Sequence, residues 1–157
     1  MPNNFAKITP VSLGNIPNKA TIVAQSAGVF GTAAATNGQS SATYGVHFKM
    51  SERDDKYLII IQHNTPGDSG ASVDVTIKAG NNGKWSNGDY TFAVAKNKVA
   101  FVQIESGRFK SEAPNDTLKA LATNSSDASS YTENMKGDVV ITASSAQVSI
   151  TVVKVAF

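Results

Sequence analysis

The chain has 157 residues and no cysteine, which excludes thiolate metal sites, iron–sulfur clusters and cysteine nucleophiles. Long hydrophobic runs are missing too. No stretch approaches the roughly 20 apolar residues that cross a bilayer, so we expect no membrane contact. The opening stretch MPNNFAKITPVSLGNIPNKA lacks the apolar core of a signal peptide, and we therefore expect synthesis in the cytoplasm.

A dominant charge of one sign is also missing. The chain carries 14 lysine and arginine residues against 12 aspartate and glutamate residues, which leaves a net charge of +2. These charges are spread along the sequence, and the longest charged run, at 52–56, is mixed in sign. A basic patch of the kind that binds nucleic acid is therefore not expected.

Histidine is scarce, and this decides how the one catalytic motif is interpreted. The sequence GDSG at 67–70 surrounds the nucleophile in trypsin-like serine proteases, where a base and an orienting acid must accompany the serine. His47 and His63 precede Ser69 too closely for the barrel that supplies those partners in that fold. The stretch TPGDSG is rich in turn-forming residues instead, and it predicts a hairpin loop.

Carboxylates offer two further chemistries. Asp74 and Glu105 lie in strand-like segments and could pair across a cleft, as glycosidase carboxylates do, although most strand carboxylates simply face water. The acidic turn at 52–55 and the pair Asp68 and Asp74 lack the ligand spacing of a calcium loop. We predict no metal, no cofactor and no enzymatic activity, with a hydrolase as the least favoured alternative.

The residues that are abundant are Val, Ile, Thr, Phe and Tyr, in short alternating runs that are typical of strands. The pattern predicts an all-β fold, a single antiparallel β-sandwich of jelly-roll or immunoglobulin-like type. Short connectors such as SERDD, TPGDSG, KNK and SSA predict antiparallel hairpins. Strands are expected at 20–25, 43–50, 57–64, 71–79, 90–96, 99–105, 138–144 and 147–157.

Two segments stand out from this pattern. Residues 1–18 contain three prolines among scattered apolar residues, so we expect an extended N-terminal arm that lies outside the sandwich domain at 19–157. The long loop at 106–137 is expected to hold one short helix at NDTLKALAT, capped by Asn115 or Asp116. The candidate contacts with a partner are Phe5, Ile8, Val11, Leu13, Ile16, Leu118 and Leu121.

Two apolar features remain open to more than one interpretation. Trp85, the single tryptophan, lies in the loop GNNGKWSNGD, where it either folds back onto the core or stacks on a ligand such as a sugar. The run Leu58–Ile61 is apolar at every position, which is typical of a central strand or of a strand whose outer face meets a partner.

Three segments, VDVTIKAGN (73–81), GDYTFAVAKNKVAFVQIESGRFK (88–110) and KGDVVITASSAQVSITVVKV (136–155), resemble the small β-rich capsid decoration proteins of tailed bacteriophages. Those sequences share a strand ending in AGN, a glycine-rich loop, an ESGRF-like turn and a final pair of strands. ESGRF is intact here at 105–109, whereas Lys96 and Asn97 depart from the family pattern. In this turn we expect Gly107 to have a positive φ, Phe109 to pack inward and Arg108 to pair with Glu105.

The resemblance implies a cement or head auxiliary protein that binds the outside of an assembled capsid and reinforces it. It implies the major capsid protein as the partner, a homo-oligomer with a trimer preferred, and a place on the exterior of the virion after synthesis in the host cytoplasm. The long insertion after Phe109 and the N-terminal arm depart from the family pattern. The alternative is a carbohydrate- or receptor-binding module of a phage tail or fibre.

Overall fold

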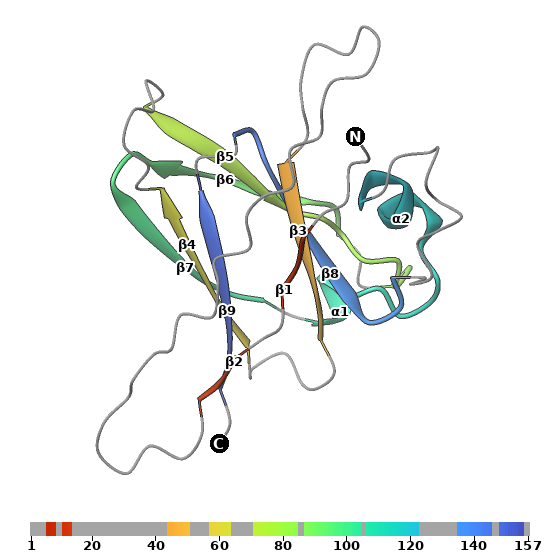
Figure 1. Ribbon diagram of the computed structural model, residues 1–157. Coiled ribbons are helices and arrows are strands. Elements are labelled where there is room, and N and C mark those ends of the chain that lie inside the picture. The colour runs from red at the N-terminus through yellow and green to blue at the C-terminus, as the bar shows by residue number, and fades with distance from the viewer. Residues whose placement is uncertain are drawn as a thin grey trace, which may run out of the picture.

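The computed structural model describes residues 6–8, 11–13, 44–50, 57–63, 71–84, 87–104, 106–122, 135–145 and 148–155. This part of the chain is mostly β, with two sheets and two short helices (Figure 1). The five-stranded sheet has the order β1 (Ala6–Ile8), β3 (Tyr44–Lys49), β8 (Asp138–Ala143), β5 (Ser72–Ile77) and β6 (Tyr90–Ala95). The four-stranded sheet has the order β2 (Val11–Leu13), β9 (Ser149–Val155), β4 (Tyr57–His63) and β7 (Lys98–Gln103).

Most of the expected strands are present. Seven of the eight predicted segments contain a strand, and the eighth, 20–25, lies outside the described residues. The expectation of purely antiparallel sheets is wrong, because β1 pairs with β3 and β2 pairs with β9 in parallel. The β-branched residues that give β5 its buried-exposed alternation made its position predictable, whereas β1 and β2 have three residues each and give little pattern.

The four short connectors do not form hairpins. The strands that they join, β3 and β4, β4 and β5, β6 and β7, and β8 and β9, belong in each case to different sheets. Turn-forming residues reverse the chain equally well within a sheet and between two sheets, so composition could not separate the two outcomes. At the β6–β7 turn Asn97 has a φ of 60°, and its N–H donates to the His63 carbonyl at 2.6 Å.

One hydrophobic core is shared by the two sheets. The ring centroids of Phe48 on β3 and Tyr57 on β4 lie 6.2 Å apart, which joins one sheet to the other. Strand β4 is central in its sheet, between β9 and β7, and its Ile59 and Ile61 are fully buried. The core contains Val46, Phe48, Ile59, Ile61, Val75, Ile77, Ile141, Ile150 and Val152, among others.

The N-terminal arm does not stand apart from the sheets where it is described. Strands β1 and β2 extend one edge of each sheet, and Ile8 is only 8% exposed within the shared core. The expectation of a separate arm is therefore wrong for these two strands. An edge strand needs backbone partners on one side only, so short segments on either side of Pro10 can pair without a donor at the proline. Phe5 and Ile16 lie outside the described residues, as do the side chains of Val11 and Leu13.

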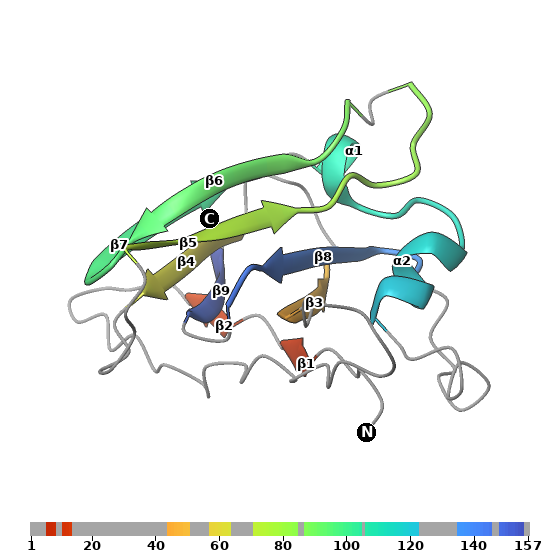
Figure 2. The same cartoon turned by 90° about the horizontal axis from the view of Figure 1, so that it is seen from above.

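The predicted helix in the long loop is confirmed as α2 (Asp116–Ala122), which lies against β3 (Figure 2). Asn115 caps it, because its Oδ1 accepts a hydrogen bond from the Leu118 N–H at 3.0 Å. Leu118 is only 3% exposed, so the expectation that it forms a contact surface is wrong: the helix turns this side chain inward. The side chain of Leu121 lies outside the described residues.

Candidate functional site

An open cleft of about 400 Å³ lies between β6, β7 and helix α1 (Ser106–Phe109). Its lining comes from Tyr90 at the start of β6, from residues 101–104 along and after β7, and from Arg108 and Phe109 of α1. Two large apolar side chains here face solvent, since Tyr90 is 43% exposed and Phe101 is 66% exposed. The cleft therefore combines exposed aromatic rings with an arginine.

The cleft exists because β6 and β7 separate after a tight turn. Each strand is the last in its sheet, and the two sheets approach one another at the turn that joins them. Figure 1 shows the two strands close together at this turn and farther apart toward α1. Helix α1 follows β7 in the chain and bounds the wide end of the opening.

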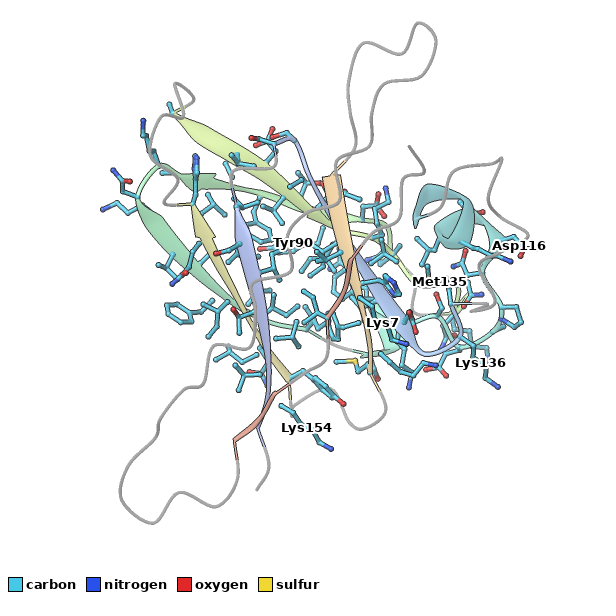
Figure 3. All side chains as sticks on the ribbon, viewed as in Figure 1. Lys7, Tyr90, Asp116, Met135, Lys136 and Lys154 are labelled. Carbon is cyan, nitrogen blue, oxygen red and sulfur yellow. The ribbon has the colours of Figure 1, made fainter. Side chains whose placement is uncertain are left out.

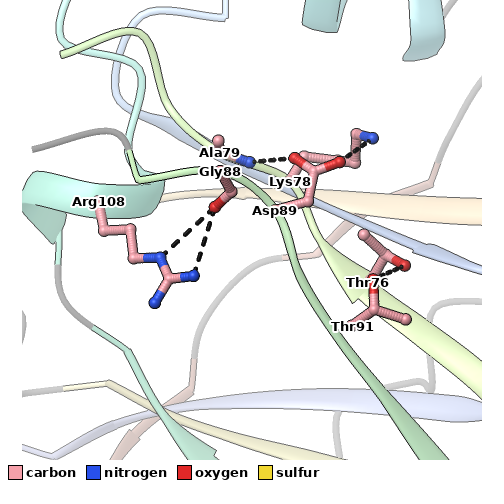
Figure 4. A network of polar contacts seen from close by, with 7 residues as sticks. All are labelled: Thr76, Lys78, Ala79, Gly88, Asp89, Thr91 and Arg108. Atoms are coloured by element: carbon pink, nitrogen blue, oxygen red, sulfur yellow. Dashed lines mark hydrogen bonds and ion pairs between the residues drawn. The ribbon is translucent and has the colours of Figure 1, made fainter. Parts of the chain in front are cut away.

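Arg108 is held in place by neutral groups. Its Nε and Nη2 donate to the Gly88 carbonyl at 3.5 and 3.4 Å (Figure 4). The guanidinium carbon lies 4.8 Å from the centroid of the Phe109 ring and 5.8 Å from that of Tyr90. Within the described segments no carboxylate forms an ion pair with Arg108. The side chain is thus positioned by a carbonyl and two rings, and no carboxylate of the described residues neutralises its positive charge.

The expected ESGRF turn is in fact the short helix α1. Phe109 is 5% exposed, which confirms that it packs inward. The expectation of a positive φ at Gly107 is wrong, because the backbone at this position is helical and the described glycines with positive φ are Gly88 and Gly137. Glu105, the expected partner of Arg108, lies outside the described residues.

The loop between β5 and β6 carries the groups that hold Arg108. Lys78 and Asp89 form an ion pair across the base of this loop, and the Ala79 N–H donates to Asp89 Oδ1 at 2.8 Å (Figure 4). Partial burial acts to raise the pKa of Asp89. The hydrogen bonds from Lys78 and Ala79, together with the charge of Lys78, outweigh burial and lower this pKa below its ordinary 3.8. Asp89 therefore stays ionised near neutral pH and joins the two ends of the loop through Lys78 and Ala79.

Close backbone packing fixes α1 against the same loop. The Gly80 N–H donates to the Arg108 carbonyl at 2.8 Å, and Asn81 exchanges hydrogen bonds with Ala113 at 3.1 and 3.3 Å. A Cβ on Gly80 would lie 2.3 Å from the Lys110 carbonyl oxygen, so only glycine fits without displacing backbone. The AGN and SGRF segments are therefore in direct contact.

Both histidines are buried and paired. His63 is fully buried, with Nδ1 3.1 Å from the Val94 carbonyl oxygen, and His47 Nδ1 lies 2.7 Å from Asp138 Oδ2. Neither imidazole faces solvent in a position to serve a surface nucleophile. Ser69 lies outside the described residues, and the carboxylate of Asp74 is on an exposed residue of β5.

The outer face of β7 forms a second exposed feature beside the cleft. Val99 is 45% exposed and Phe101 66% exposed, whereas Ala100 and Val102 on the same strand pack against the core. We call Val99 and Phe101 the β7 patch. Half-buried Ile60 is the register partner of Phe101 on the neighbouring strand β4, so the patch continues across the sheet.

Sequence reasoning did not single out Tyr90 or Phe101. The signal was present in VAFVQI, where apolar residues occupy both faces of one strand, but that pattern does not say which face is buried. Of the predicted site residues, Trp85 lies outside the described residues. Ile8 and Leu118 are both buried rather than gathered on one surface. Figure 3 shows the labelled Tyr90 away from Asp116 and Met135, which belong to the region of α2.

Neither the other side chains of the described residues nor a similarity to known proteins assigns a chemistry to the cleft. The described residues contain no cluster of three or more ligating side chains that could hold a metal. None of the helices in the described segments is long and apolar enough to cross a membrane. No protein-family model, no curated protein and no solved structure significantly matches this chain.

Proposed function

We propose that this protein is a structural protein of a phage virion, which binds the outer surface of the assembled capsid and stabilises it. The observation that carries the proposal is the β7 patch, in which Phe101 is 66% and Val99 45% exposed. The shared core is filled without these two side chains. Exposed large apolar residues next to a well-filled core favour a contact with another protein.

The resemblance to decoration proteins supports the same function. Its two most recognisable segments, AGN at 79–81 and SGRF at 106–109, contact one another through the hydrogen bond from Gly80 to Arg108. Segments that are separate in the sequence thus form one structural unit.

The finer fold assignment is also a proposal, namely a β-sandwich of jelly-roll or immunoglobulin-like type. Two sheets that share one core support it. Chain crossings between the sheets at every short connector support it as well, because such crossings are typical of Greek-key and jelly-roll sandwiches.

The proposed partner is the major capsid protein, and the proposed assembly is a homotrimer on the capsid exterior. A closed symmetric oligomer covers apolar surface that an isolated subunit leaves wet, and because the β7 patch is proposed to meet the capsid, the proposed trimer contact lies outside this patch. We propose no enzymatic activity. The burial of both histidines supports this, because a surface nucleophile would need an accessible base.

Saturable co-sedimentation of the purified protein with assembled capsids tests the function. Phe101→Ser should weaken binding at least tenfold, about 1.4 kcal/mol, while the melting temperature stays near that of the parent. The matched control is Lys136→Ser, an exposed position in the turn before β8. Failure of the parent protein to sediment with any capsid of its own phage would refute the proposal.

A carbohydrate- or receptor-binding module is the second candidate, and one observation favours it. Tyr90 and Phe101, both exposed, line the same open cleft, and exposed aromatic rings are the usual platform for sugars. This candidate predicts binding to host-surface glycans and none to capsids, so the sedimentation experiment separates the two.

A further inference from the structure

The cleft lies along strand edges that could accept another strand. β7 is the last strand of its sheet, and no strand of the described residues pairs with the edge opposite β4. Its residues 101–103 line the cleft together with Tyr90, which belongs to β6, the last strand of the other sheet. An unpaired edge presents a row of backbone donors and acceptors that an extended chain can satisfy.

The charge at the cleft specifies what such a chain must carry. Arg108 is the one charged side chain among the described residues that line it. Arg108, at the wall of the cleft, has no carboxylate partner among the described residues, and its Nη1 makes no hydrogen bond there. A guanidinium held by a carbonyl and two rings is ready to form a forked pair with a carboxylate.

The exposed rings specify the rest of the ligand. Phe101 and Tyr90 offer apolar surface at the mouth of the cleft, and buried Phe109 and Ile104 line it further in. Side chains of an added strand alternate between two directions, so apolar residues can meet the rings while acidic residues reach Arg108.

We infer that the cleft binds an extended segment of a partner protein that alternates apolar and acidic residues, adds a strand to β7 and pairs with Arg108. Under the proposed function, on which the identity of the partner rests, this segment belongs to the capsid subunit. A second copy of β7 fits less well, because residues 90–103 bring lysines and no carboxylate for Arg108.

A peptide titration tests the inference without any capsid. The probe is a short synthetic peptide of alternating valine and glutamate, blocked at both ends, and the control peptide has lysine in place of glutamate. Two-dimensional NMR of the full-length protein should show its largest shifts at Tyr90, along β7 and Ile104, and at the Arg108 side chain. Amides of β7 should exchange more slowly with solvent when the glutamate peptide is bound, which reports backbone pairing.

Two variants locate the interaction. Arg108→Gln should weaken binding of the glutamate peptide about tenfold or more, because it removes one partner of a charge pair. Since Arg108 also contacts Gly88, Phe101→Ser serves as a second variant at a residue whose side chain is mostly exposed. The charge control is Lys136→Gln, which should bind the peptide as the parent does.

The outcomes separate this inference from the proposed function. Equal binding of the glutamate and lysine peptides, or unchanged affinity in both variants, overturns the inference whatever the capsid experiment gives. Shifts at Tyr90 and Phe101 with a chitin oligosaccharide, without binding of the glutamate peptide, overturn it in favour of a sugar site. If both variants still bind capsids as the parent does, the proposed capsid-binding function is retained, but the cleft is not the site that contacts the capsid. Peptide binding with no capsid binding supports the cleft and refutes the function.

Discussion

His47 and Asp138 form a buried pair on one face of the five-stranded sheet, with His47 Nδ1 2.7 Å from Asp138 Oδ2 and both side chains 1% exposed. His47 of β3 is the register partner of Val140 on β8, so Asp138 lies two residues along on the same face. The second carboxylate oxygen, Oδ1, is buried and has no hydrogen-bond partner among the described residues. The hydrogen bond with His47 is therefore the side-chain contact that offsets the loss of water around the buried Asp138 carboxylate.

Replacing the histidine alone should be costly. His47→Phe leaves Asp138 buried without its hydrogen-bond partner, and we expect a loss of about 1–3 kcal/mol in the free energy of unfolding. The double variant with Asp138→Leu should recover part of this loss, because it removes the stranded carboxylate as well. Urea unfolding of the two variants measures the difference. Equal stability of His47→Phe and the parent would show that the carboxylate needs no partner.

Gly80 should tolerate no side chain. Gly80→Ala places a Cβ against the Lys110 carbonyl, so α1 or the loop must move, at a cost of about 1–3 kcal/mol. Gly83→Ala in the same loop is the matched control, because a Cβ there meets nothing within 4 Å, and we expect a change within about 0.5 kcal/mol. Thermal unfolding compares them. If Gly80→Ala and Gly83→Ala lose the same amount of stability, the packing argument is contradicted.

The sequence predicted the strand positions better than their partners. Alternation in SVDVTI depends on neighbours along the chain, so β5 could be located without knowing the sheet. The partner of β4 depends instead on which sheet each connector enters. KNK is as suited to a crossing as to a hairpin, so the assignment of β6 and β7 to separate sheets could not be derived.

The candidate site was harder to predict for the same reason. The cleft requires Tyr90, Phe101 and Arg108 to meet where two sheets diverge, and no local pattern links three residues from two strands and a helix. Leu118 illustrates the converse error. The sequence correctly indicated the helix that carries it, but could not say whether Leu118 meets a partner or the protein's own sheet.

Asp89 should make the β5–β6 loop sensitive to acid. Its pKa is lowered in the folded protein, so its contribution to stability is complete above the unfolded value and is lost as the pH falls through the folded value. Asp89→Asn should therefore destabilise the protein at neutral pH, and the difference from the parent should shrink as the pH falls below 3.8. Chemical unfolding along a pH series measures this. A difference that is constant with pH would show that the charge of Asp89 does not matter.

The N-terminal strands should contribute to folding rather than act only as a contact arm. Ile8 lies in the shared core at 8% exposure, so Ile8→Ala should cost about 2–5 kcal/mol, less if the edge strand can adjust. Its exposed neighbour on β1 provides the control, and Lys7→Ala should cost no more than about 1 kcal/mol, because a contact made by an exposed lysine contributes little. Deleting β1 and β2 together would remove the parallel partners of β3 and β9 and leave two longer unpaired edges. The truncated protein should melt at a lower temperature and self-associate more readily, as calorimetry and sedimentation would show. If the truncated protein has the same melting temperature as the parent, these strands add nothing to stability, and the segment is available to a partner.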